Sequence, residues 1–196
     1  MVGRFDGRKP NSRAQAAHRL AHPMITIRDF IPDDLEPITQ IYAHHVLHGT
    51  ATFDEIAPSI EEIGRKTHKV RAQGLPWLIA EADGVVAGYA YAAPFRERSA
   101  YRFTLENSVY VDAAHLRMGI GRTLLTELIA RCEALGYRQM IAAIGDSGNH
   151  GSIRLHRALG FEDAGVYRSV GMKFGRWLDV VLMQRSLGEG NRSLQL

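Results

Sequence analysis

The sequence predicts a single α/β domain built around a central β-sheet. Strand-like and helix-like segments alternate along most of the chain, which is typical of helices packed on a sheet. The length of 196 residues suits one domain. The composition, with 45% hydrophobic and 23% charged residues, is that of an ordinary globular protein.

The chain divides into three parts by composition. We expect the domain to span residues 24–187, where no repeat, low-complexity tract or internal linker interrupts the pattern. Residues 1–23 are polar and rich in arginine, and we interpret them as a basic N-terminal extension outside the core. Residues 188–196 form a short C-terminal tail.

The net charge of +3 belongs to the N-terminal extension. Without residues 1–23, the chain holds 19 basic and 20 acidic side chains, a balance that does not favour a nucleic-acid partner. No apolar run approaches the roughly 18 residues that indicate a membrane helix. The single cysteine, Cys132, fits a reducing compartment. We therefore expect a cytoplasmic protein with no membrane or nucleic-acid partner.

The first part of the domain predicts one strand and two helices. Residues 25–28 begin with β-branched side chains and alternate, which favours a strand. Apolar residues at helical spacing follow Asp33 and Asp34, which suit the first turn of a helix. A weaker helical pattern covers residues 60–70 and stops at Gly74.

The middle of the domain predicts a β-hairpin, a further strand and a long helix. Asp-Gly at 83–84 separates apolar runs over 76–82 and 85–93, and this dipeptide strongly indicates a hairpin turn. A strand follows over 105–111, and residues 123–135 form the clearest helix. Its apolar stripe consists of Leu124, Leu125, Leu128, Ile129, Cys132 and Leu135, with Gly136 at the position after the helix. The remaining pattern predicts a strand over 139–144, a helix over 152–159 that ends at Gly160, and two closing strands over 166–173 and 178–187.

A glycine-containing turn, RMGIG at 117–121, joins the strand over 105–111 to the long helix. The first turn of a helix has unpaired N–H groups and positive potential, so such a turn can hold a phosphate. The turn lacks the Gly-Lys-Ser/Thr of a Walker loop and the third glycine of a dinucleotide fingerprint. The motif alone therefore leaves two interpretations open, a phosphate site and a tight strand-to-helix turn.

The wider pattern resembles the GNAT N-acetyltransferase superfamily. R-x-G-x-G precedes the long helix, and N-x-x-S-x-x-L-H-x-x-L-G-F covers 149–161. Three blocks resemble the phosphinothricin and methionine sulfone acetyltransferase branch: PWLIAEADGVVAGYAYAAPFRERSAYRFTLENSVYV, GNHGSIRLHRALGF and GMKFGRWLDV. The resemblance covers nearly all of residues 24–187. One departure is Leu116, because the superfamily usually carries Gln or Arg there.

The resemblance implies a mixed, mostly antiparallel sheet flanked by helices and a homodimer with the acceptor site near its interface. It also implies acetyl-CoA as co-substrate, a small-molecule amine as acceptor and no metal. The residues expected at the co-substrate are Val109, Val111, Leu116, Arg117, Met118, Gly119, Ile120, Gly121, Arg122, Thr123, Asn149 and Ser152.

Glu106 is the candidate general base. It lies in an otherwise apolar strand, where a carboxylate is costly unless it is solvated or paired, and burial would raise its pKa toward a useful range. The residues alone leave a solvent-facing glutamate as the alternative. In the resembling branch, the glutamate of E-x-S-V-Y-V is the proposed base, acting directly or through a water.

Other residues of the reaction are also implied by the resemblance. Arg96, Arg98 and Tyr101 correspond to residues that line the acceptor site, and guanidinium groups suit carboxylate or phosphinate oxygens. Without the resemblance, the two arginines would be interpreted as a solvated loop. Phe53 resembles the aromatic residue that closes the site. The candidate proton donors to the leaving thiolate are Tyr110 and His156.

Two other readings of the sequence are rejected, and two rival functions stay open. His44 and His48 share a helix face, but no third metal ligand is evident. Cys132 lies on the apolar stripe, where packing explains it better than covalent catalysis. The rival functions are acetylation of another amine, such as an ordinary amino acid, a polyamine or a protein N-terminus, and a CoA-binding sensor without turnover.

Overall fold

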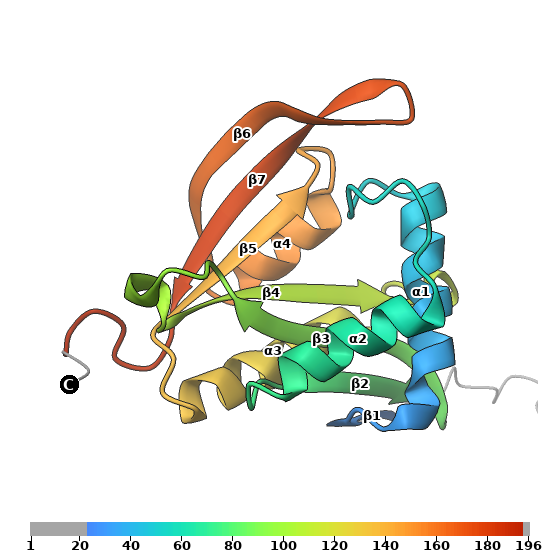
Figure 1. Ribbon diagram of the computed structural model, residues 1–196, viewed down its shortest axis with the longest axis horizontal. Helices are drawn as coiled ribbons and strands as arrows, with labels where there is room; N and C mark the ends of the chain where they lie inside the picture. The colour runs from blue at the N-terminus through green and yellow to red at the C-terminus, as the bar shows by residue number, and fades with distance from the viewer. Residues whose placement is uncertain (1–22, 194–196) are drawn as a thin grey trace, which may run out of the picture.

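A computed structural model describes residues 23–193 of the chain, so residues 1–22 of the expected extension and 194–196 of the tail lie outside it. The described residues form a seven-stranded sheet in the order β1-β2-β3-β4-β5-β7-β6 (Figure 1). Every neighbouring pair is antiparallel except β4 and β5, which confirms the mixed, mostly antiparallel sheet. The elements are β1 (Ile25–Asp29), α1 (Leu35–His48), α2 (Ile60–Arg71), β2 (Trp77–Ala82), β3 (Val85–Pro94), β4 (Thr104–Val111), α3 (Ile120–Ala134), β5 (Gln139–Gly145), α4 (His150–Ala158), β6 (Glu162–Lys173) and β7 (Arg176–Ser186).

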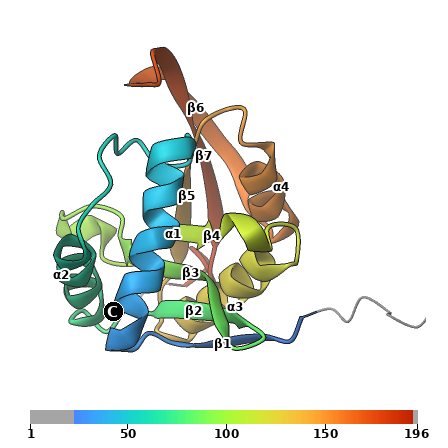
Figure 2. The same cartoon turned by 90° about the vertical axis from the view of Figure 1, so that its right-hand side faces the viewer.

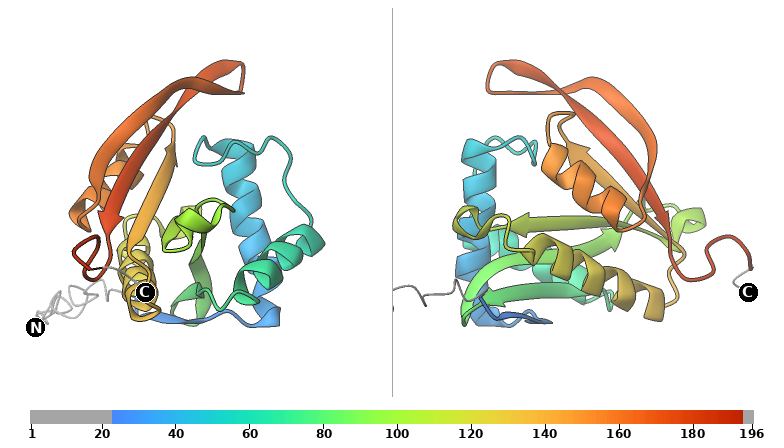
Figure 3. Two further views of the ribbon diagram at one scale, coloured as in Figure 1. Left: turned by 60° about the vertical axis from the view of Figure 1, so that its left-hand side comes forward. Right: turned by 180° about the vertical axis from the view of Figure 1, so that it is seen from behind.

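The helices cover both faces of the sheet. Figure 2 places α2 on one side of the strands and α3 and α4 on the other, and Figure 3 shows α3 and α4 together from behind. Ile38 and Val46 of α1 and Leu124 and Leu128 of α3 are fully buried against the strands. In the described part of the chain, no helix is long and apolar enough to cross a membrane.

Local sequence signals explain several of the element boundaries. Asp83 and Gly84 both have positive φ angles, 50° and 82°, as a two-residue hairpin turn between β2 and β3 requires. Ser59 and Glu62 form a reciprocal capping box that begins α2. Gly136, with φ of 85°, follows the end of α3 in the left-handed conformation that favours glycine.

The prediction that Leu135 belongs to the buried stripe of α3 is wrong. Leu135 is 53% exposed, whereas Leu125, Ile129 and Cys132 are buried as expected. The helix begins at Ile120 and ends at Ala134, so Leu135 already belongs to its C-terminal cap. Its backbone is still in the right-handed helical region, so the exposure reflects its place at the end of the helix.

Strands β4 and β5 separate soon after they begin, and this separation positions the functional site. Their parallel ladder joins Thr104–Glu106 to residues 139–141 only. β4 nevertheless continues to Val111, and β5 continues to Gly145 while it pairs with β7 along its other edge. Figure 1 shows the two arrows diverging. The inner edges of both strands are therefore left without a partner strand in the middle of the sheet.

Candidate active site

A cavity of about 720 Å³ occupies the space between the separated strands. Its walls are residues 108–111 of β4 and 142–145 of β5, and the turn before α3 and the first two turns of α4 complete it. Ten of the expected co-substrate residues line it: Val109, Val111, Leu116, Arg117, Gly119, Ile120, Gly121, Arg122, Asn149 and Ser152. Met118 and Thr123 do not line it, and the Thr123 hydroxyl instead donates to the Gly119 carbonyl at 3.2 Å.

The glycine turn has the backbone geometry of an anion site. Gly119 is the N-cap of α3 with φ of 87°, a left-handed conformation that L side chains rarely adopt. No side chain caps the helix at this end. The N–H groups of the first turn thus have no intrahelical acceptor and are available to a ligand in the cavity. Arg117 and Arg122 add positive charge at the same place.

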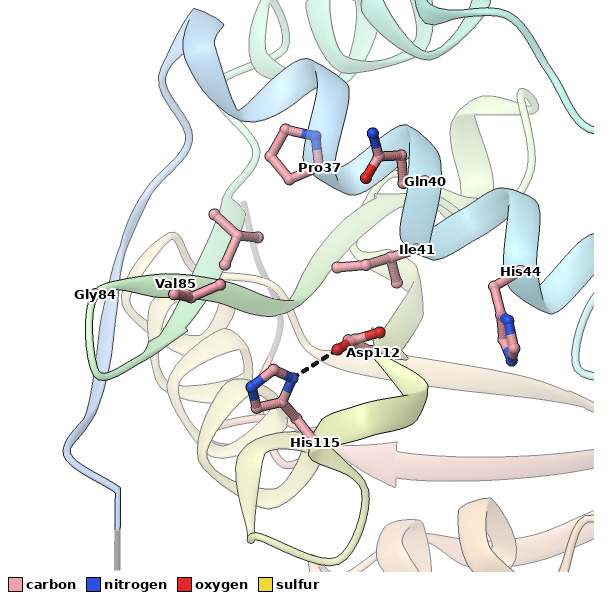
Figure 4. A pocket seen from close by; sticks show the side chains of 9 residues that line it. Pro37, Gln40, Ile41, His44, Gly84, Val85, Asp112 and His115 are labelled. Atoms are coloured by element: carbon pink, nitrogen blue, oxygen red, sulfur yellow. Dashed lines mark hydrogen bonds and ion pairs between the residues drawn. The ribbon is translucent and has the colours of Figure 1, made fainter.

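His115 lies at the start of this turn and was missed in the sequence. Its Nδ1 is 2.6 Å from Asp112 Oδ2, and its side chain contributes to the wall of the cavity. The same histidine also lines a second hollow of about 650 Å³ between α1 and the β2–β3 turn, where Figure 4 shows it with His44 and Asp112. No sequence pattern marks His115, because both hollows that it lines are formed by residues distant in the chain.

Glu106 lies on β4 at the end of the parallel ladder, opposite Ala93 of β3 and beside Ile141 of β5. Burial raises the pKa of its carboxyl group above the ordinary value, while the positive charges of Lys66 and Arg96 act in the opposite direction. The side chain is partly buried and does not line the cavity between the strands. Strand alternation places it on the same face of the sheet as Ser108 and Tyr110, both of which line the cavity.

Tyr110 belongs to an aromatic cluster on that face. Its ring stacks on Tyr89 with centroids 5.2 Å apart and meets Tyr42 edge-on at 5.0 Å. Burial raises the pKa of Tyr110 well above its ordinary value, so the phenol keeps its proton at neutral pH. Because Tyr110 also lines the cavity, it stands between the cavity and the cluster.

His156 of α4 is buried with both ring nitrogens engaged. Nδ1 donates to the Ser152 carbonyl at 2.8 Å, and Nε2 is 3.0 Å from Asn107 Oδ1. The Asn107 amide in turn donates to the Ile141 carbonyl at 3.0 Å, directly beyond the last rung of the β4–β5 ladder. Burial lowers the pKa of His156, with the bond to Ser152 acting in the opposite direction. Asn107, which sequence reasoning missed, thus links β4, β5 and α4.

Phe53 is held at the far end of β5 by close packing. A side chain added at Gly145 would meet Phe53 Cε1 at 2.8 Å, and Gly171 of β6 approaches the same ring. The backbone beside Phe53 is fixed by the buried Lys173, whose ammonium donates to the Gly49 and Thr52 carbonyls at 2.9 Å each. Lys173 has no counterpart among the expected site residues.

The remaining acceptor-site candidates lie on the exposed segment between β3 and β4. Arg96 packs on the Phe95 ring at 5.0 Å, and Tyr101 meets the same ring edge-on at 5.6 Å. Arg98 is exposed, and its guanidinium has no hydrogen bond or ion pair within residues 23–193, while its backbone carbonyl accepts from the Tyr101 N–H at 2.9 Å. Of these three residues, Arg96 is the one whose charge acts on the pKa of Glu106.

Cys132 and the histidines of α1 make their contacts within the fold. Cys132 is fully buried, and burial raises the pKa of its thiol to about 12, which keeps it unreactive. His45 contacts the Val111 carbonyl at 2.9 Å, and the rings of His44 and His48 are 4.9 Å apart. Across residues 23–193, no group of three or more His, Cys, Asp or Glu side chains is placed to hold a metal.

Comparisons with known proteins agree with this architecture. The model of the acetyltransferase (GNAT) family matches residues 39–161. The chain is 53% identical over 185 residues, 94% of each chain, to phosphinothricin N-acetyltransferase of Alcaligenes faecalis. It is 41% identical to the L-methionine sulfoximine/L-methionine sulfone acetyltransferase of Salmonella typhimurium, covering 84% of this chain and 96% of the relative.

A solved structure gives the same fold with a bound ligand. The GNAT phosphinothricin acetyltransferase from Sinorhizobium meliloti, solved in complex with acetyl-CoA, superimposes with a TM-score of 0.85 and 47% identity over 88% of this chain and 93% of that one. A Salmonella typhimurium acetyltransferase with its cofactor acetyl-CoA gives 0.82 and 40%, over 85% and 96%. With this sequence identity over nearly the whole domain, the chain belongs to the acetyltransferase (GNAT) family, in its phosphinothricin and methionine sulfoximine acetyltransferase branch.

Proposed function

We propose that this N-acetyltransferase transfers the acetyl group of acetyl-CoA directly to the primary amine of a small amino-acid-like acceptor. Phosphinothricin, methionine sulfone and methionine sulfoximine are the expected acceptors, since the similar relatives are named for them. The observation that carries the proposal is the position of Glu106. Its carboxyl group, with a raised pKa, lies on the strand whose free edge forms one wall of the cavity.

The cavity has the features that a coenzyme A thioester needs. The N–H groups at the start of α3, together with Arg117 and Arg122, suit a pyrophosphate. The unpaired inner edges of β4 and β5 offer backbone N–H and C=O groups to the amide-containing pantetheine arm. Bound there, the co-substrate supplies an activated acetyl thioester, and the two strand edges orient it with respect to Glu106.

Glu106 would accept the proton of the acceptor's ammonium group, directly or through a water. A carboxylate with an ordinary pKa is a weak base at neutral pH, and the burial of Glu106 moves its pKa toward the useful range. The protonated amine is thereby converted to the nucleophile that attacks the thioester carbonyl. No metal is needed for this chemistry.

Of the two candidate proton donors, we favour Tyr110 for the departing thiolate because of its position. It lines the cavity and is protonated at neutral pH, although its raised pKa makes the phenol a weaker acid than an ordinary tyrosine. His156 also lines the cavity, but each of its ring nitrogens already faces a protein acceptor. We assign His156 the task of holding Asn107, and with it the point where β4 and β5 separate.

The acceptor site would be formed on the face that carries Glu106. Arg96, Arg98 and Tyr101 are proposed to hold an anionic head group, and Phe53 to close the site. Arginine-lined surroundings would repel a polyamine, which argues against spermidine as the acceptor.

The test measures free-thiol release from acetyl-CoA with a panel of acceptors. The panel contains L-phosphinothricin, L-methionine sulfone, L-methionine sulfoximine, ordinary L-amino acids, spermidine and a short peptide. Glu106→Gln is compared with Glu36→Gln, an exposed glutamate of α1 that serves as the matched control. Selective turnover of the first three acceptors, lost only in Glu106→Gln, is expected. Preference for spermidine or the peptide would overturn the acceptor class, and tight acetyl-CoA binding without turnover would indicate a sensor.

A further inference from the structure

Lys66 of α2 lies over the aromatic cluster beside the proposed base. Its ammonium nitrogen is 4.9 Å from the centroid of the Tyr91 ring and 5.7 Å from that of Tyr42. Tyr91 is opposite Ser108 of β4, and Glu106 is two residues further along the same face of that strand. A cation from α2 is thereby brought to the face of the sheet where the acceptor's amine would be deprotonated.

This ammonium group has no polar partner among the described residues. Within residues 23–193, it makes cation–π contacts but no hydrogen bond and no ion pair. It is nevertheless the cation with the largest effect on the pKa of Glu106, ahead of Arg96. The positive charge of Lys66 therefore acts on Glu106 across a space, without an ion pair between the two groups.

Such a separated pair of opposite charges matches the two charged groups of an α-amino acid. Its amine and its carboxylate are attached to the same carbon atom, so a site that directs the amine to a carboxylate needs a cation close by. A lysine ammonium is a compact point charge with three donors on a flexible stem, which suits a carboxylate. The amine would face Glu106 while the carboxylate faces the nearest unpaired cation.

We propose that Lys66 binds the α-carboxylate of the acceptor and so selects α-amino acids over simple amines. This inference rests on the proposed function. It assigns the other flanking cation, Arg96, to the distal phosphinate, sulfone or sulfoximine group, for which a guanidinium fork is better suited. The selectivity of the site would then depend on a residue outside the arginine-containing loop.

Two simpler roles for Lys66 predict different behaviour. If Lys66 only braces α2 on Tyr91 and Tyr42, its loss should lower stability and affect all acceptors alike. If it only tunes Glu106, its loss should raise the pKa of that carboxyl group further and move the acidic limb of the pH profile to higher pH for all acceptors. Of the three roles, only a contact with the carboxylate predicts that loss of Lys66 changes the preference for acceptors that carry a carboxylate over those that lack it.

The experiment compares L-methionine sulfone with 3-(methylsulfonyl)propan-1-amine, which is the same molecule without its carboxylate. Values of kcat/KM for both are measured by thiol release across a pH range for the parent, Lys66→Met and Lys66→Arg. Lys69→Met serves as the matched control, because Lys69 is an exposed lysine on the same helix. Thermal unfolding of each variant monitors the bracing role.

The parent should prefer the amino acid by about 10- to 100-fold, the range expected of one charge-assisted contact. Lys66→Met should abolish most of this preference through KM, Lys66→Arg should restore part of it, and Lys69→Met should leave it unchanged. Equal losses on both acceptors, or an undiminished preference in Lys66→Met, would overturn the inference while leaving the acetyltransferase function intact. If the parent acetylates neither molecule nor phosphinothricin, it is the proposed function that fails.

Discussion

Glu106 combines two properties that oppose each other in a folded protein. Its burial is useful to a general base, but it makes the ionised form costly to the fold. The raised pKa means that, between the unfolded and folded values, the native state binds more protons than the unfolded state. Stability therefore falls as the pH rises through this window. Replacing the carboxylate by its neutral isostere should relieve that cost and remove the base.

Glu106→Gln should accordingly lower activity and raise stability at the same time. We expect kcat/KM for the preferred acceptor to fall by at least about 100-fold and Tm at pH 7 to rise by about 2 °C. The gain in Tm should shrink as the pH is lowered and Glu106 becomes protonated in the parent. Calorimetry at several pH values checks this, and a loss of stability at pH 7 would show that the carboxylate is well satisfied.

In the parent protein, kcat/KM should rise with pH along a single acidic limb. The limb reports deprotonation of Glu106, so its midpoint should lie above the ordinary pKa of glutamate. Initial rates across pH 5 to about 9 at saturating acetyl-CoA measure it. A limb at an ordinary glutamate pKa would argue that the base is another group.

The residues at the site also show what the sequence can and cannot predict. Glu106 and Gly119 are visible because a carboxylate in an apolar strand and a glycine before a helix are local anomalies. Lys66, Asn107 and His115 have no such signal. Their importance arises from tertiary contacts, such as the ring of Tyr91 below Lys66, which join residues distant in the chain.

Among the elements, the turn before α3 contributes several residues to the cavity wall. The sequence predicts that the helix starts at Thr123, whereas α3 begins three residues earlier, at Ile120, because the low helix propensity of Gly121 masks the first turn. The hairpin and the remaining strands were predictable from alternation and turn residues. The separation of β4 and β5 was not, since both strands have ordinary strand sequences throughout.

Gly119→Ala should weaken co-substrate binding beyond its effect on stability. The left-handed backbone costs an alanine about 1–2 kcal/mol, so the turn should shift and its N–H groups should lose their alignment. Gly136→Ala is the matched control, because Gly136 has φ of 85° at the other end of α3 and equally open surroundings. We expect similar losses of Tm in both, with an increase in KM for acetyl-CoA in Gly119→Ala alone. Equal KM values would separate the turn from phosphate binding.

The segment between α1 and α2 depends on one buried lysine of β6. Lys173→Met would leave the Gly49 and Thr52 carbonyls without their donor, which costs about 1–3 kcal/mol for buried groups. Phe53 would lose its fixed position, so we expect KM for the acceptor to rise while KM for acetyl-CoA changes little. Steady-state kinetics on both substrates tests this, and an effect on acetyl-CoA alone would contradict it.

For the whole molecule, the β6–β7 hairpin is the most conspicuous surface. It projects beyond the rest of the fold in Figure 1 and exposes large apolar side chains: Tyr167, Val170, Met172, Phe174 and Trp177. Exposed apolar patches of this kind mark interaction sites. We propose that this surface forms the homodimer interface that the family resemblance implies.

Trp177→Glu should therefore convert a dimer to a monomer in solution. Trp177 is 66% exposed, so the change should leave the core unaffected, whereas a charge placed in an apolar interface weakens association strongly. Light scattering coupled to size exclusion measures the mass, and Val85→Glu, at another exposed apolar position, serves as control. A parent that is already monomeric would refute the interface.

The early end of the β4–β5 ladder also determines how the molecule holds together. Within residues 23–193, the strand ladder between the β1–β4 half of the sheet and the β5–β7 half consists of the rungs at 104–106, next to which the Asn107 amide bonds to the Ile141 carbonyl. A ligand that bonds to both free edges would serve as an additional, non-peptide strand and make the sheet continuous. Ligand binding would then stabilise the association of the two halves. The free energy of unfolding would therefore rise with the fraction of protein that holds the ligand.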